Sequence, residues 1–218
     1  MPSKIKIDHF PSIYPPRPAS AIDPATISRY QGYIAQYKYD DIRLLSYIHP
    51  TGRVELLNRK REPILSYHLD SGMKRAFGKL NLTHGKHHLL DGGLLRGTVQ
   101  AGRPRTIVLW DILIHDDQYL LGTSYCQRYN TLKGICGNPT LQEHESGEEV
   151  GLIIAPGLWL APTFDDRLER RFELTKLADR LEGLMLKNPD GQLDWGVREE
   201  NNGSWQIRVR KQSGRHVF

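Results

Sequence analysis

Gln36-Tyr37-Lys38-Tyr39-Asp40-Asp41-Ile42-Arg43 carries more information about the fold than any other part of this sequence. It lies between two runs that are typical of β-strands, 33–37 and 42–48. Residues two apart on a strand project to the same face, so Lys38 and Asp40 would face the same way. An amine nucleophile beside a carboxylate that can hold a metal ion is the minimum for attack on phosphorus. Such a pair is also common on protein surfaces, so the pattern needs further motifs to indicate this chemistry.

Five further motifs follow in order along the chain. They are an arginine-rich turn, an aspartate with two glycines, a Trp-Asp pair in an apolar run, an acid before a lysine, and alternating cations: 56–62, 88–94, 107–113, 182–187 and 204–211. In this order the set resembles the covalent nucleotidyltransferase superfamily of ATP-dependent DNA ligases, RNA ligases and mRNA-capping guanylyltransferases. The resemblance runs from about residue 33 to residue 211, which is most of the chain.

The resemblance implies catalytic and metal-binding roles for three residues. Lys38 matches the lysine that attacks the α-phosphorus of ATP and carries AMP as a phosphoramidate. Asp40 and Glu182 match acids that serve catalysis and hold a divalent metal ion. Hard oxygen ligands of this kind suit Mg²⁺ or Mn²⁺.

The resemblance also implies how ATP is bound. Gln36 would face the edge of the adenine, and Trp110 matches an aromatic residue that stacks on the purine. Arg43 and Arg59 match cations that contact ribose, phosphate or the 5′-phosphate of a nucleic acid.

Three further cations would surround the triphosphate and neutralise charge as pyrophosphate leaves. Lys187 belongs to this group and also has a catalytic role in the family. Arg208 and Arg210 stand where the family usually carries lysines. Arginine keeps the charge and offers a fork for phosphate, but it does not deliver a proton as lysine can.

Two other positions depart from the family pattern. The glycine that usually follows the motif I aspartate is Asp41 here, and the acid of the family's Asp-Gly-Glu-Leu motif is Gly93. In the family that acid contacts the ribose or helps to position metal. Asp91 is a weak candidate to replace it. These changes bear on activity more than on the fold.

Composition indicates the class of protein. The chain has 218 residues, of which 39% are hydrophobic and 25% charged, and this is enough to build a core. It lacks a run of 18 apolar residues and an apolar stretch after its N-terminus, which argues against a membrane span and a secretory signal. Cys126 and Cys136 are too few for a disulfide scaffold. We expect a cytoplasmic protein without a membrane partner, and its net charge of +5 permits nucleic acid as a partner.

The expected fold class is α+β, a nucleotidyltransferase (ligase adenylation) fold of mostly antiparallel sheets flanked by helices. Residues 1–28 hold six prolines and predict an irregular N-terminal arm, in which a short helix could follow Asp23-Pro24. Residues 29–218 would form the nucleotidyltransferase (adenylation) domain. Helices are expected near 68–80 and after Thr163, which would cap the second helix with Asp166. Beyond the two runs above, strands are expected at 53–57, 88–99, 105–114, 150–160, 183–187 and 204–210. We expect no oligonucleotide-binding (OB) barrel, because the eight residues after Arg210 are too few to form one.

The function that these motifs predict is an ATP-dependent polynucleotide ligase that joins 5′-phosphate and 3′-hydroxyl ends through a lysyl-AMP intermediate. RNA ends are slightly preferred over nicked DNA, because one branch of RNA ligases lacks the barrel. Two alternatives stay open. One is a GTP-using, capping-type guanylyltransferase, and the other is a non-catalytic nucleic-acid-binding relative, motivated by Gly93 and the altered last motif.

Two features fall outside these motifs. His84, His87 and His88 lie close together, but neither Cys nor acidic residues stand at zinc spacing, so a loop or strand surface is expected. Arg128 matches an arginine that often follows the aromatic motif in ligases, and a structural role is expected for it.

Overall fold

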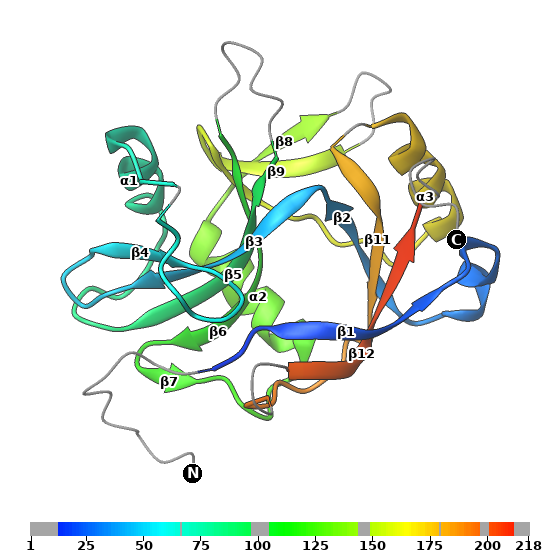
Figure 1. Cartoon of the computed structure of the whole chain (residues 1–218), viewed down its shortest axis with the longest axis horizontal. Helices are drawn as coiled ribbons and strands as arrows, with labels where there is room; N and C mark the ends of the chain where they lie inside the picture. Colours follow the sequence, from blue (N-terminus) through cyan, green and yellow to red (C-terminus); the bar gives the residue numbers. More distant parts are fainter. Residues whose placement is uncertain are drawn as a thin grey trace.

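The chain passes from one β-sheet to another at Asp40, directly after Lys38. Strand β2 (Ile34–Tyr39) belongs to a four-stranded sheet, and β3 (Asp41–Ile48) belongs to an eight-stranded sheet. The structure is a computed structural model, and it describes residues 13–65, 67–96, 105–143, 149–178, 180–196 and 201–211. Figure 1 shows β2 and β3 following each other between the two sheets.

The smaller sheet has the strand order β1-β12-β11-β2. Its other strands are β1 (Pro16–Ile22), β11 (Leu181–Lys187) and β12 (Asn201–Arg210). Strand β1 runs parallel to β12, whereas β11 is antiparallel to both of its neighbours. In β2, Ala35, Tyr37 and Tyr39 are buried in the core on one face, so Gln36 and Lys38 project from the other face.

The larger sheet has the order β4-β3-β5-β6-β10-β9-β8, with β7 paired to β6. Its other strands are β4 (Val54–Leu57), β5 (His88–Leu95), β6 (Ile107–His115), β7 (Gln118–Tyr119), β8 (Thr140–Glu143), β9 (Glu149–Ala155) and β10 (Leu158–Leu160). The pair β6–β10 is parallel, and the other pairs of this sheet are antiparallel. Strand β5 is buried along its whole length because it lies between β3 and β6 and both of its faces are covered.

The helices cover the two sheets separately. Helices α1 (Ser71–Phe77) and α2 (Tyr125–Cys136) share a hydrophobic core with the larger sheet, and α3 (Leu168–Leu177) and the 3₁₀ helix η1 (Pro24–Arg29) share one with the smaller sheet. Among the described helices, none combines the length and the apolar character that crossing a lipid bilayer requires. The observed architecture is α+β with mostly antiparallel pairing, as predicted.

The N-terminal segment is more regular than the sequence indicates. Residues 16–22 form β1, where an irregular arm is expected. The short helix η1 follows Asp23, where the sequence allows one, and the Asp23 side chain accepts from Ala25 N. Prolines are tolerated here because β1 is an edge strand. Of the predicted arm, residues 1–12 lie outside the described residues, as do 97–99 of the strand predicted at 88–99.

The predicted start of the second helix is wrong. Thr163 does not cap it, because the next residue, Phe164, makes a β-bridge with Ala35 through two backbone hydrogen bonds of 2.7 and 2.9 Å. The helix α3 therefore begins only at Leu168. Its N-cap residue, Arg167, is in the left-handed region with φ of 51° and makes no side-chain cap.

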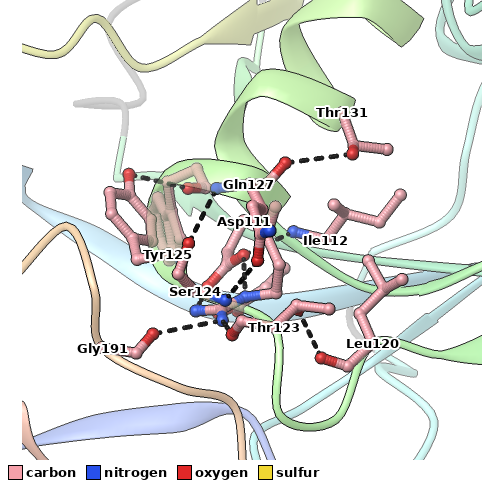
Figure 2. A network of polar contacts seen from close by, with 12 residues as sticks. Asp111, Ile112, Leu120, Thr123, Ser124, Tyr125, Gln127, Thr131 and Gly191 are labelled. Atoms are coloured by element: carbon pink, nitrogen blue, oxygen red, sulfur yellow. Dashed lines mark hydrogen bonds and ion pairs between the residues drawn. The ribbon is translucent and has the colours of Figure 1, made fainter.

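Helix α2 is absent from the sequence-based prediction. Its buried stripe includes Arg128 among apolar residues, which hides the apolar periodicity. A local signal was present: Ser124 and Gln127 form a reciprocal capping box at the helix start. Figure 2 shows these two residues at the first turn of α2.

Candidate active site

A cleft opens where the two sheets meet, and eight of the ten predicted site residues line it. Gln36 and Lys38 come from β2, and Lys187 comes from β11. The other five lie on β3, β6 and β12 or in the loop after β4: Arg43, Arg59, Trp110, Arg208 and Arg210. The fold thus gathers residues from five of the six motifs on one concave surface.

The two predicted acids stand beside the lysine rather than in the cleft wall. Lys38 Nζ makes an ion pair with Glu182 Oε2. Glu182 is the extra residue of a β-bulge, because Leu181 pairs with Tyr39 and Gly183 pairs with Lys38. Bulges re-aim side chains, and this one brings the Glu182 carboxylate to the amine.

Asp40 lies at the bend between the sheets, next to Glu182. Burial and the neighbouring charge of Glu182 raise the pKa of Asp40. Burial alone would raise the pKa of Glu182 as well, but its hydrogen bond with Lys38 and the charges of Lys38 and Arg210 hold it below the usual value. Two adjacent carboxylates that repel each other are a suitable oxygen donor set for Mg²⁺ or Mn²⁺. The residues present therefore fit the predicted metal.

The floor of the cleft is formed by Gln36 and Lys187, which are both buried. Lys187 Nζ donates to Gln36 Oε1 at 2.6 Å and lies 4.2 Å from the centroid of the Tyr125 ring. Gln36 Nε2 donates to the Ala161 carbonyl at 3.3 Å, which leaves its second N–H for a ligand. Burial lowers the pKa of Lys187 to about 7, although the charge of Asp111 opposes this.

One wall carries the predicted aromatic residue. Trp110 is half-buried, and the Arg43 guanidinium carbon lies 5.7 Å from its ring centroid. Arg43 donates through Nε to Asp91 Oδ1 at 2.9 Å and through Nη2 to Asp91 Oδ2. The buried Asp91 carboxylate is therefore engaged by Arg43. Arg59 reaches the cleft from an exposed loop position.

The two departures from the family pattern meet in space. Asp41 lines the cleft, and a Cβ added at Gly93 would lie 2.6 Å from the Asp41 Cγ and Oδ1 atoms. The same Cβ would lie 2.7 Å from Trp110 Cη2. The Asp41 carboxyl thus occupies the space into which a side chain at position 93 would project. Burial raises the pKa of Asp41 to about 7, although Lys38 and Arg43 oppose this.

The opposite wall is strongly basic. Arg208 and Arg210 on β12 are joined there by Arg17 on β1, which sequence reasoning missed because β1 itself was not predicted. Burial and the charges of Arg210 and Arg17 lower the pKa of Arg208. The Arg208 Nε atom is buried and has no hydrogen-bond partner among the described residues. A wall of like charges of this kind favours an anionic ligand.

A buried ion pair supports the site from behind. Arg128 is fully buried and donates through Nε and Nη2 to Asp111, at 2.9 and 3.1 Å. Its Nη1 donates to the carbonyls of Thr123 and Gly191, at 2.6 and 3.4 Å. Figure 2 shows Asp111 together with Thr123 and Gly191, which come from separate parts of the chain. Because Asp111 follows Trp110 on β6, this network holds the strand that presents the aromatic wall.

Comparisons by sequence find no match, either to a protein-family model or to a curated protein. Comparison of the structure finds the ligase domain of M. tuberculosis LigD, with a TM-score of 0.62 and 17% identity over 89% of this chain and 58% of that one. A mycobacterial DNA ligase D complexed with ATP and MES gives a TM-score of 0.61 and 18% identity, over 91% and 60% of the two chains. This chain has the fold of ATP-dependent ligases.

A bacteriophage ligase has the same fold. The ATP-dependent DNA ligase of bacteriophage T7, in complex with ATP, has a TM-score of 0.54 and 18% identity, over 91% of this chain and 68% of that chain. The present chain spans about three fifths of the length of the first two ligases. The likeness is consistent with the nucleotidyltransferase superfamily that the motifs predict.

Proposed function

We propose that this chain is an ATP-dependent polynucleotide ligase that joins 5′-phosphate and 3′-hydroxyl ends through a lysyl-AMP intermediate on Lys38. The observation that carries the proposal is the position of the Lys38 amine. It lines a cleft between an aromatic wall at Trp110 and the basic wall at Arg208 and Arg210, and it contacts Glu182. An amine, a surface for a purine and a basic wall for phosphates are the three parts that adenylylation needs. The ATP complexes of structurally similar ligases support ATP as the nucleotide.

In the first step the neutral Lys38 amine attacks the α-phosphorus of ATP. The N–P bond forms, the bond to the bridging oxygen of pyrophosphate breaks, and the amine gives up a proton to water. In the next two steps a 5′-phosphate oxygen displaces Lys38 from AMP, and a 3′-hydroxyl oxygen then displaces AMP to seal the strand. Arg208, Arg210 and Lys187 would stabilise the charge on the departing pyrophosphate.

Glu182 holds the amine before the reaction. The amine makes an ion pair with the Glu182 carboxylate and has to leave it to reach the α-phosphorus of a bound nucleotide. Nucleotide binding must therefore weaken the Lys38–Glu182 contact. A Mg²⁺ or Mn²⁺ ion held by Asp40 and Glu182 would neutralise charge on the phosphates when bound.

Asp41 supplies the acidic group that the family carries at the position of Gly93. Its carboxyl lies over Gly93 and beside Trp110. From there it would accept hydrogen bonds from the ribose hydroxyls of a nucleotide whose base lies on Trp110.

The test is covalent labelling with ATP that carries radioactive phosphorus at the α-position. The wild-type protein should form a labelled adduct with Mg²⁺ or Mn²⁺, and Lys38→Ala should form none. Lys74→Ala, which changes an exposed lysine on α1, is the matched control and should label like the wild type. A labelled Lys38→Ala protein would overturn the assignment of the nucleophile.

The same assay separates the alternatives. An adduct with GTP instead of ATP would identify a capping-type guanylyltransferase, and no adduct with either nucleotide under both metals would identify a non-catalytic relative. The slight preference for RNA ends stays a prediction. It is tested by sealing matched RNA and DNA nicks and single strands with one preparation.

A further inference from the structure

A second cluster of metal-ligating side chains lies at the far end of strands β5 and β6. His88 is the first residue of β5 and His115 is the last residue of β6, its antiparallel neighbour. Asp116 follows in the turn to β7, with a positive φ of 50°. Gly93, at the cleft, is five residues away along β5, which is about 17 Å for an extended strand. The cluster is thus separate from the candidate active site.

The two imidazole rings face each other through one nitrogen each. His88 Nδ1 lies 3.2 Å from His115 Nδ1. Two nitrogens bound to one tetrahedral zinc ion at 2.0–2.1 Å are about 3.3 Å apart. The observed separation is therefore close to the one that a shared ion would require.

The His88 ring is held in a form that leaves Nδ1 for a ligand. His88 is 1% exposed, and its Nε2 lies 3.1 Å from the Thr83 carbonyl, to which it donates. With the proton on Nε2, the Nδ1 atom carries the lone pair. The backbone N–H of Asp116 donates to this Nδ1 atom over the long distance of 3.4 Å. Metal-binding histidines commonly donate their other ring N–H to a backbone carbonyl in this way.

Asp116 completes the group with a carboxylate that is poorly satisfied. Its oxygens lie 3.8 Å from His88 Nε2 and 3.6 Å from His115 Nε2, both beyond hydrogen-bond distance. Its Oδ1 atom is buried and has no hydrogen-bond partner among the described residues. Burial of such an oxygen without a partner is costly, and a bound cation would remove that cost.

The neighbouring Asp117 differs from Asp116 because both of its oxygens are engaged. Oδ1 accepts from His87 N and Oδ2 accepts from Lys86 Nζ, each at 2.8 Å. The ligand atoms of His88, His115 and Asp116 all lie within 4.8 Å of one another. We propose that these three residues bind a divalent transition-metal ion of the zinc class, with solvent as a further ligand. Such an ion would tie the β6–β7 turn to the start of β5.

The two sites on the chain differ in the metal that they suit. Two imidazole nitrogens and one carboxylate favour zinc, cobalt or nickel, whereas the carboxylates of Asp40 and Glu182 favour magnesium or manganese. The histidine site rests on geometry alone and is independent of the proposed ligase activity. The sequence spacing argued against a metal site at His84, His87 and His88. The partners of His88 are His115 and Asp116, which lie 27 and 28 residues further along the chain and are brought near by the pairing of β5 with β6.

The test is a titration of the whole chain with Zn²⁺ and Co²⁺ after treatment with a chelator. Calorimetry measures the affinity for Zn²⁺, and the visible absorption of Co²⁺ reports tetrahedral coordination. His115→Ala and Asp116→Asn should each weaken binding about tenfold to a hundredfold, and excess Mg²⁺ should not compete. Asparagine tolerates the positive φ at position 116, so the turn is retained.

His84→Ala is the matched control, because His84 is exposed in the loop just before β5 and lies outside the cluster. It should bind both ions as the wild type does. Circular dichroism of each variant checks that it is folded. If folded His115→Ala and Asp116→Asn bind Zn²⁺ and Co²⁺ as tightly as the wild type, the proposal is wrong, and hydrogen bonds alone hold the cluster together.

Discussion

Replacing Gly93 by alanine should displace two side chains of the cleft, lower the unfolding free energy and slow labelling by ATP. The new Cβ would lie 2.6 Å from the Asp41 carboxyl and 2.7 Å from the Trp110 ring, and both distances are too short for unbonded atoms. Both side chains must move, and overpacking of this kind costs about 1–3 kcal/mol of unfolding free energy. Because both side chains line the cleft, labelling by ATP should slow about tenfold, which corresponds to about 1.4 kcal/mol in the barrier.

A double-mutant cycle isolates the contact with Asp41. Asp41→Ala removes the Cγ and Oδ1 atoms that the new methyl group would meet, so Gly93→Ala should cost less in that background. The contact with Trp110 remains, and we expect a coupling free energy of about 1 kcal/mol between positions 41 and 93. Denaturant unfolding of the wild type, both single variants and the double variant gives this value.

The matched control is Gly134→Ala in α2. Apart from the neighbouring residues and the backbone of α2 itself, no atom of the described residues lies within 4 Å of a Cβ added there, and the site is exposed. Alanine should raise the unfolding free energy by about 0.5–1 kcal/mol through its higher helix propensity. If Gly93→Ala is as stable as the wild type, or if positions 41 and 93 are additive within about 0.5 kcal/mol, then Asp41 does not fill the space over Gly93.

Three further predictions concern single residues. Arg128→Ala leaves the Asp111 carboxylate buried without its ion pair and should lower the unfolding free energy by about 3–5 kcal/mol, whereas Lys133→Ala on the exposed face of the same helix should change it by less than about 0.5 kcal/mol. The raised pKa of Asp41 means that the folded state keeps this proton longer than the unfolded state, so wild-type stability should fall between about pH 4 and pH 7. Asp41→Asn should remove the contribution of Asp41 to this fall in unfolding free energy, which is at most about 4 kcal/mol. Urea unfolding across this pH range measures it, and equal pH profiles for the wild type and the variant would contradict the prediction. Arg208→Gln should raise the ATP concentration needed for half-maximal labelling about tenfold and leave AMP binding nearly unchanged, as equilibrium dialysis of AMP would check.

The strands around Lys38 could be predicted because local sequence specifies them. Alternation in β2 places the lysine opposite buried tyrosines, and the hairpin from β3 to β4 turns at Gly52, whose φ is 78°. The motifs also indicated ten site residues, and eight of these line one cleft in the structure. Their assigned roles in catalysis and binding remain predictions.

What the sequence did not reveal depends on contacts between distant segments. The pairing of β1 with β12 brings Arg17 to the cleft, and no periodicity in a proline-rich segment indicates it. The late start of α3 follows from the bridge between Phe164 and Ala35. Asp41 lies near Gly93 because β3 pairs with β5. The sequence does not show which strands become neighbours. The structural role expected for Arg128 agrees with its buried contacts.

The outermost position of β1 has a practical consequence for protein production. An expression clone that starts after residue 22 would leave the backbone N–H and C=O groups along one side of β12 without strand partners. Bare strands of this kind pair readily with other molecules, so we expect such a shortened protein to aggregate. A screen for soluble fragments should therefore keep the proline-rich segment that forms β1.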